Sequence, residues 1–294
     1  MARIDEVGPW SRKKLDLLRN YLIAYTQIMS SEKIKSWCKS RHYVDAFAGA
    51  TYHVDKESYE LIEGSPRIAL NLEPGFDTYS FIDMDRRRIE DTIDPLRDEY
   101  PEKSKNIHAH CGDCNQILTE KILPQFPKNG FCPQRGFMFL DPYGINLNWS
   151  TVEAVANSRI FDVLINFSVM GVYRKLGDKP PCDCDRQKIN ALMGTEDWFK
   201  VAYAENKQMS LLDLPGLNKF ERRSHEIAER LVTFYQKRLQ TCFKHVSRAV
   251  IMKNSSGGPM YALILASHAE LAKKKMEEIF ARDKKRPNIN VMYG

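Results

Sequence analysis

The residues best suited to chemistry follow a short apolar run near the middle of the chain. Residues 137–140 (FMFL) carry no charge, which is typical of a strand buried on both faces of a sheet, and they are followed by Asp141, Pro142, Tyr143 and Gly144. In open α/β sheets ligands bind beyond the carboxyl ends of the strands, so a carboxylate at this point would face a crevice. The same four residues could also form an ordinary turn, and both interpretations stay open on these residues alone.

An earlier segment ends in a similar way. Residues 42–50 read as a short strand that runs into small residues and contains Asp45, Phe47 and Gly49. Small side chains at the end of a strand let a ligand approach the backbone closely.

Two further predicted strands also end in acids. Residues 78–82 precede Asp83, at a position where an acid commonly accepts hydrogen bonds from ribose hydroxyls, while Asp85 can cap the helix that follows. The strand expected at residues 107–111 is followed by Asp113, which could equally be a helix N-cap or a ligand contact.

The elements that would hold these residues alternate along the chain. Strand-like runs separated by helical patterns predict five βα units, the last strand covering residues 161–167, and right-handed crossovers make their sheet parallel. Residues 247–252 and 260–267 are joined by so short a loop that they must pair in antiparallel fashion. We therefore predict an α/β, Rossmann-like fold: a mostly parallel sheet with a C-terminal antiparallel hairpin and helices on both faces.

Segments that do not follow this alternation of strands and helices suggest the domain organisation. Residues 1–41 are expected to form an N-terminal helical flank, and residues 171–217 a helical insertion after the fifth strand that covers the crevice and binds substrate or a partner. Residues 42–170 and 218–294 then form the Rossmann-like domain.

The link after the first strand is expected to be irregular. Residues 51–63 are polar, and Ser65 is the expected N-cap of the next helix, with Pro66 at its first position. No GxGxxG pattern occurs here, which counts against a standard NAD-binding motif.

Composition and charge place few limits on function. The chain has 294 residues, 43% hydrophobic and 28% charged, enough for one large core, and its formal net charge of +6 allows a polyanionic partner without requiring one. Each basic run is expected to be a solvated helix face unless the runs converge in space. These runs cover residues 12–14, 86–88, 222–223, 273–275 and 284–286.

Seven cysteines and the absence of an apolar leader indicate a reducing compartment, so we expect a cytoplasmic protein. Its apolar runs are too short to cross a bilayer. The pairs Cys111 with Cys114 and Cys182 with Cys184 could be zinc ligands, but ordinary thiols fit their positions and spacing better, and we expect no metal.

Together these motifs resemble class I S-adenosylmethionine-dependent methyltransferases and, more closely, the three-Cys-motif partner proteins, a bacterial family known mainly for genomic pairing with a protein that bears a three-cysteine motif. The resemblance extends from about residue 13 to the C-terminus. It is carried by residues 43–49 (YVDAFAG), 64–66 (GSP), 81–83 (FID), 140–144 (LDPYG) and 162–167 (DVLINF).

The resemblance implies an S-adenosylmethionine site. Asp45 and Gly49 would line the methionine moiety, with Phe47 in the same site, while Asp83 would hold the ribose hydroxyls and Asp113 would lie by the adenine amino group.

The resemblance also implies a reaction centre, which Asp141 would share with the cofactor site. The Asp141-Pro142-Tyr143 element is similar to the Asp-Pro-Pro-Tyr motif of amino-methyltransferases. There the acid and the proline carbonyl accept hydrogen bonds from an exocyclic amino group, and the aromatic ring stacks on the base. A base inside a duplex would first have to be flipped out.

Three functions remain open on the sequence. The first is methyl transfer to an exocyclic amino group of a DNA or RNA base. The second is a catalytically silent subunit that regulates or scaffolds a three-cysteine-motif protein, favoured by the family pattern and by Gly49-Ala50 standing in place of Gly-x-Gly. The third, a nucleotide-dependent oxidoreductase, is disfavoured by the missing fingerprint and the terminal hairpin.

Overall fold

The computed structural model describes residues 5–127, 132–177, 180–205, 220–222, 227–254 and 256–284. Within these ranges the main sheet has eight strands in the order β11-β13-β8-β7-β2-β5-β6, with β12 also paired to β13. The bounds of its strands are β2 Ser40–Asp45, β5 Thr78–Asp83, β6 Ile107–Cys111, β7 Gln134–Leu140, β8 Phe161–Phe167, β11 His245–Val246, β12 Val250–Lys253 and β13 Pro259–Ser267.

The predicted fold class is confirmed by this topology. The five strands from β2 to β8 are mutually parallel, whereas β13 runs antiparallel to both β8 and β12. The sheet is mostly parallel, as in a Rossmann-like fold, with a reversed hairpin at one edge.

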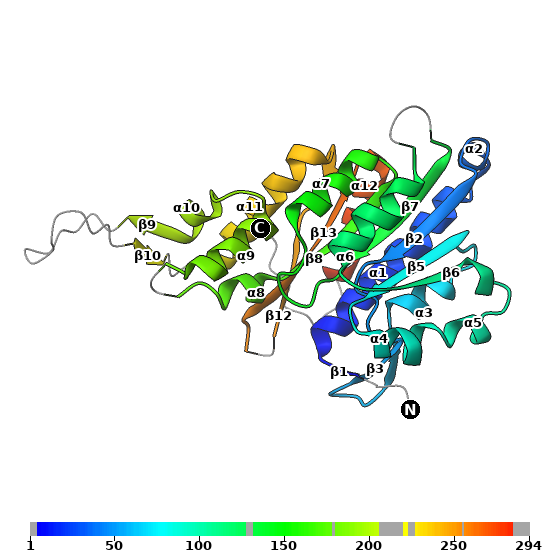
Figure 1. Ribbon diagram of the computed structural model, residues 1–294, viewed down its shortest axis with the longest axis horizontal. Coiled ribbons are helices and arrows are strands. Elements are labelled where there is room, and N and C mark those ends of the chain that lie inside the picture. The colour runs from blue at the N-terminus through cyan, green and yellow to red at the C-terminus, as the bar shows by residue number, and fades with distance from the viewer. Residues whose placement is uncertain are drawn as a thin grey trace, which may run out of the picture.

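Helices cover both faces of the sheet (Figure 1). Alternate residues of β7 point to opposite sides, so Met138 and Leu140 pack in one core and Phe137 and Phe139 in the other. The face with Met138 is covered by α6 Cys114–Ile117, α7 Trp149–Ser158 and α11 Ile227–Cys242. The opposite face is covered by α1 Pro9–Met29, α3 Ser65–Leu70 and α12 Glu270–Lys284.

Short helices complete the links between these elements. They are α2 Glu32–Lys35, α4 Arg86–Arg88, the π-helical turns Ile89–Ile93 and Leu118–Ile122, α5 Leu96–Glu99, and the 3₁₀ turns Ser104–Asn106 and Leu123–Gln125.

The link at residues 51–63 was expected to be irregular, and that expectation was wrong. It contains β3 Tyr52–Asp55 and β4 Leu61–Glu63, which form a small sheet with β1 Asp5–Val7 in the order β1-β3-β4. Asp5 pairs with His53 in parallel register, a contact between residues far apart in sequence. No local periodicity could reveal that partner.

The N-cap of α3 is Gly64 and not Ser65, and Pro66 stands at the second helical position. A side chain is excluded at Gly64 because an added Cβ would lie 2.2 Å from the carbonyl oxygen of Ala50. Ser65 is buried, and its hydroxyl instead hydrogen-bonds the Asp45 carboxylate.

The predicted insertion begins within α8 Val169–Tyr173 and continues through α9 Asp183–Met193, α10 Trp198–Ala202 and β9 Tyr203–Glu205, which pairs with β10 Phe220–Arg222. Residues 206–217 of this insertion lie outside the described residues. Figure 1 shows α9, α10 and the β9–β10 pair at one end of the molecule, beyond β12. The division into flank, insertion and main domain stays a prediction.

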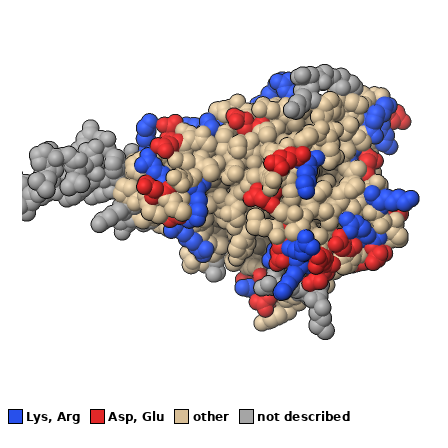
Figure 2. All heavy atoms as spheres, in the orientation of Figure 1, with Lys and Arg blue, Asp and Glu red and all other residues tan. Residues whose placement is uncertain are grey.

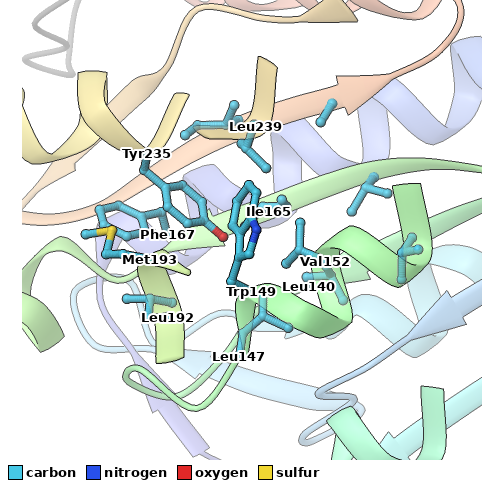
Figure 3. Close-up of a cluster of buried hydrophobic side chains, with 14 of the residues drawn as sticks. Leu140, Leu147, Trp149, Val152, Ile165, Phe167, Leu192, Met193, Tyr235 and Leu239 are labelled. Carbon is cyan, nitrogen blue, oxygen red and sulfur yellow. The ribbon is translucent and has the colours of Figure 1, made fainter. Parts of the chain in front are cut away.

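A buried aromatic cluster joins α9 to α7, β8 and α11 (Figure 3). The ring of Tyr235 stacks on Phe167 with centroids 4.4 Å apart and meets Trp149 edge-on at 6.1 Å. Gly194 ends α9 in the left-handed conformation with φ of 67°, and an added Cβ there would lie 2.1 Å from the Trp149 indole. Only glycine allows α9 to approach α7 so closely.

Candidate functional site

The order in which successive strands are added to the sheet reverses at β2, which pairs with β5 on one side and β7 on the other. The strands β5 and β6 extend the sheet in one direction, and β7 and β8 extend it in the other. In open parallel sheets this switch point leaves a crevice beyond the carboxyl ends of the two central strands. Asp45 is the last residue of β2, in register with Phe139, and Asp141 directly follows β7. The fold therefore places these two predicted site residues at the carboxyl ends of the two central strands.

Asp141 is held by partners from two other elements. The Asn166 amide of β8 donates to Asp141 Oδ1 at 2.7 Å, and the Lys14 ammonium of α1 donates to Oδ2. The Lys14 and Asp141 side chains are only 15% and 19% exposed, so this ion pair is largely screened from water. The carboxylate is fixed in orientation before any ligand arrives.

Asn166 is fully buried, and the Oδ1 atom of its side-chain amide has no hydrogen-bond partner among the described residues. An unpaired buried acceptor costs free energy unless a donor reaches it. The amide is thus committed to Asp141 on one side and offers an acceptor on the other.

Asp45 is fully buried beside this pair. The pKa of its carboxyl group is raised to about 7, chiefly by burial and also by the nearby Asp141 charge, against hydrogen bonds from Ser65, Phe47 N and Tyr43 that lower it. Asp45 therefore changes its charge near neutral pH. A cation placed next to it would favour the ionised form.

Asp83 and Gly49 lie together, as predicted for one ligand site. Gly49 N donates to Asp83 Oδ2 at 3.1 Å, and Asp85 N donates to Oδ1 at 2.8 Å. Gly49 adopts φ of 61°, which favours glycine at the tip of this loop. Arg88 adds an ion pair at 3.8 Å, so the carboxylate is oriented while remaining at the edge of the crevice.

Asp113 is the N-cap of α6, where its side chain accepts hydrogen bonds from the backbone of Asn115 at 2.7 Å and Gln116 at 3.3 Å. The N-cap interpretation is confirmed, as it is for Asp85 at α4. Asp113 follows β6, the strand that pairs with β5, and the preceding residue Gly112 donates its N–H to the Asp83 carbonyl oxygen. The adenine contact itself stays a prediction.

Pro142 and Tyr143 differ sharply in exposure. Pro142 is buried, whereas the Tyr143 side chain is 93% exposed. Leaving an aromatic ring in water is unfavourable without a partner, and a ring at this position can stack on a planar ligand. Gly144, with φ of 109° and open space around it, completes the turn.

A pocket of about 650 Å³ opens beside Tyr143 and Gly144. Its basic lining residues are Lys56, Arg88 and Arg174, and Glu6 is the one acid on its wall. Trp10 and Tyr261 add aromatic surface. The pocket combines stacking rings with positive charge, which suits a planar ligand that carries phosphates.

Lys14 was missed by the sequence analysis, which interpreted residues 12–14 as a solvated face. Instead the three residues meet three acids: Arg12 pairs with Glu60 at 2.9 Å, Lys13 with Asp283 at 2.5 Å, and Lys14 with Asp141. A signal was present, because Lys14 precedes the buried residues Leu18 and Leu22 of α1 by four and eight positions, which puts it on the same side of the helix.

The basic runs do not gather on the face drawn in Figure 2, where Lys and Arg side chains lie interspersed with Asp and Glu. Lys274 and Lys275, for example, pair with Glu270 and Glu278 on their own helix. The runs at residues 222–223 and 284–286 lie outside the described side chains.

The cysteines form no disulfide, and Cys182 and Cys184 are both exposed. Within the described ranges no three His, Cys, Asp or Glu side chains gather closely enough to hold a metal ion.

Among the described helices, none is both long and apolar enough to span a bilayer.

The residues at the crevice suit S-adenosylmethionine in chemical type. That molecule offers an ammonium group, a sulfonium, ribose hydroxyls and an adenine amino group, all of which favour acceptors or negative charge nearby. Asp45, Asp83 and Asp141 supply three carboxylates, and the positive φ at Gly49 keeps the loop between them free of a side chain. These carboxylates are therefore complementary to the cationic and hydrogen-bond-donating groups of S-adenosylmethionine.

No family model matches the chain, and no curated protein matches it in sequence. Among solved structures, a Legionella pneumophila protein described under the family model DUF519 matches with a TM-score of 0.51 and 10% identity, over 94% of this chain and 95% of that one. At that identity the likeness shows the fold alone.

A spermidine synthase in complex with the transition-state analogue AdoDATO matches with a TM-score of 0.39 and 9% identity, over 93% of this chain and 67% of that one. A score that low carries no conclusion about this chain. The resemblance to three-Cys-motif partner proteins stays an expectation.

Proposed function

We propose that this protein is an S-adenosylmethionine-dependent methyltransferase that modifies an exocyclic amino group of a nucleic-acid base. The observation that carries the proposal is the Asp141 carboxylate, held by Asn166 at the switch point of the sheet, with the exposed ring of Tyr143 two residues away.

The proposed roles follow from the chemistry of a weakly nucleophilic amino group. The Asp141 carboxylate and the Pro142 carbonyl oxygen each accept a hydrogen bond from the amino group, which localises the nitrogen lone pair. Tyr143 stacks on the base. S-adenosylmethionine, when bound, supplies the methyl group: the nitrogen forms the new N–C bond as the S–C bond breaks, and its proton passes to water. Asp141 acts by alignment, so it need not be a strong base.

The substrate class is inferred from the pocket beside Tyr143. Lys56, Arg88 and Arg174 provide charge for phosphates, and the aromatic side chains provide stacking surface for bases. An unstacked base, flipped out of a duplex or taken from a single strand, would meet Asp141 at the edge of this pocket.

A second candidate is supported by Lys14. Its ammonium occupies Asp141 Oδ2, one of the acceptors that an incoming amino group needs. A substrate must displace it, and a chain in which it stays in place would be a catalytically silent, methyltransferase-fold subunit of a three-cysteine-motif protein.

The experiment that tests the proposal is transfer of a radiolabelled methyl group to mixed DNA, mixed RNA and the partner protein, followed by digestion to nucleosides. We expect label in an N-methylated nucleoside, reduced at least about a hundredfold in Asp141→Ala. The exposed acid Asp197 lies on α10, so Asp197→Ala should keep full activity. Equal incorporation by wild type and Asp141→Ala would remove Asp141 from the mechanism.

The same assay separates the two candidates. Label in none of the acceptors, from a protein that binds the cofactor, would favour the silent subunit. Recovery of transfer in Lys14→Met would then identify Lys14 as the block.

A further inference from the structure

A second cavity lies at the opposite edge of the sheet from Asp141. Its volume is about 350 Å³, and its lining includes Gly136 and Phe161, near the amino ends of β7 and β8. We call it the amino-end pocket. The strand β8 runs from this pocket at Phe161 to the candidate site at Asn166, so the two cavities are separate.

The walls of the amino-end pocket are mostly apolar. Tyr21 and Tyr25 reach it from the C-terminal half of α1, and Leu271 and Ala272 from the first turn of α12, while Trp37 closes one side. Leu271 is 53% exposed, an unusual position for a large apolar side chain. Apolar cavities of this size are typical of small-molecule sites.

Polar groups in the wall divide into committed and uncommitted ones. Both oxygens of Asp162 are engaged, by Ser267 Oγ and by Tyr21 Oη at 3.2 Å, and burial raises the pKa of this carboxyl to about 6. The hydroxyl of Tyr25, a residue only 6% exposed, has no hydrogen-bond partner among the described residues. The pocket therefore offers a buried donor, while its one acid is already used.

The charged residues on the wall are otherwise basic: Arg135, Arg159 and Lys275. Lys275 already pairs with Glu278 at 2.7 Å, and the Arg135 guanidinium donates to the carbonyl oxygens of Cys132 and Gln134. The Arg135 guanidinium lies 4.7 Å from the Trp37 ring centre, which holds it in place. His268 also lines the cavity. Its Nε2 lies 2.8 Å from the Ala156 carbonyl oxygen and burial lowers its pKa, so it is neutral at pH 7.

We propose that the amino-end pocket binds a small amphipathic carboxylate, with its apolar body among the aromatic rings and its anionic group held by Arg159 within the positive field of Arg135. A cationic amphiphile fits less well, because Arg135 and Arg159 would repel it. This site is independent of the proposed methyl transfer.

Calorimetric titration of the full-length protein with three ligands of equal chain length tests the proposal: decanoate and decylammonium below their micelle concentrations, and decanol below its solubility limit. We expect saturable 1:1 binding of decanoate, and binding at least about tenfold weaker for the other two. No saturable binding of decanoate, or decylammonium binding as tightly, would overturn the proposal.

Two variants locate the site. Ala272→Phe fills the cavity and should weaken decanoate binding at least about tenfold. Ala24→Phe places the same ring between the same two helices but in a neighbouring groove, and should leave the affinity unchanged. Wild-type affinity in Ala272→Phe would exclude this cavity.

A second, less disruptive variant tests the same site in case Ala272→Phe does not fold. Arg159 has φ of 56°, a conformation that asparagine tolerates, so Arg159→Asn removes the charge and keeps the backbone. We expect binding about threefold weaker, with the weakening lost at high salt. An unchanged affinity in folded Arg159→Asn would contradict the anionic head group.

Discussion

Asp45 couples the charge of the crevice to pH. Its carboxyl is fully buried with a pKa raised to about 7, so below that value it is mostly protonated. A ligand cation beside it favours the ionised form, and binding then releases a proton. We predict that S-adenosylmethionine affinity rises by up to about tenfold per pH unit below pH 7 and levels off above it. Calorimetry between pH 5.5 and 8.5 measures this slope, which should vanish in Asp45→Asn; a slope kept in that variant would assign the proton to another group.

The same residue makes a prediction without ligand. Because its pKa is higher in the folded than in the unfolded chain, the folded state binds more protons between about pH 4 and 7, and Asp45 lowers stability as pH rises through that window. Asp45→Asn removes this penalty. The melting temperature of Asp45→Asn minus that of wild type should therefore be larger at pH 8 than at pH 5. The same difference in melting temperature at both pH values would refute the raised pKa.

For single residues, the sequence predicted which acids lie at strand ends, but it did not predict their hydrogen-bond partners. Asp83 and Asp141 were identified because each follows an apolar run, whereas Asp45 was identified only through the resemblance to a known family. The contacts of Lys14 and Asn166 with Asp141 span 127 and 25 residues, and such pairing is decided by the packing of α1 and β8.

Among the elements, α9 depends on its contact with α7. At Gly194 an added methyl would both strain a positive φ and clash with Trp149, whereas at Gly257, with φ of 81°, nothing lies within 4 Å. We predict that Gly194→Ala lowers the free energy of unfolding by about 3 kcal/mol and Gly257→Ala by about 1 kcal/mol. Denaturant unfolding of both variants measures the difference. Equal losses would mean that the contact with Trp149 contributes nothing.

Most strands of the main sheet were predictable from local apolar or alternating patterns, but the strand expected at residues 247–252 is β12 Val250–Lys253, and β11 His245–Val246 was not expected. The fifth strand was expected at residues 161–167, which are the bounds of β8. The β1-β3-β4 sheet was missed, since Tyr52–Asp55 is half-buried and gains its strand partner from the N-terminus. Gly64 was missed as a cap because the close approach of Ala50 that requires glycine is a tertiary contact.

For the molecule as a whole, the proposed nucleic-acid contact rests on the basic residues of one pocket and not on a broad basic surface. Three cations predict a modest salt dependence, with a slope of log K against log salt of about −2 for a single strand. Arg174→Ala should reduce that slope by about 0.7, while Lys200→Ala, 84% exposed on α10, should not change it. Fluorescence anisotropy with a labelled oligonucleotide measures both; a flat salt response would point to a protein or small-molecule substrate.

The account as a whole depends on a cofactor site at the carboxyl ends of β2, β5 and β7. Calorimetric titration with S-adenosylmethionine tests it most directly, comparing wild type with Asp83→Ala and with Asp77→Ala, an acid at the amino end of β5 that pairs with Arg41. We predict 1:1 binding by wild type and by Asp77→Ala, and binding at least about tenfold weaker in Asp83→Ala. No heat from wild type at about 1 mM ligand, or an unchanged affinity in Asp83→Ala, would contradict the proposed cofactor site.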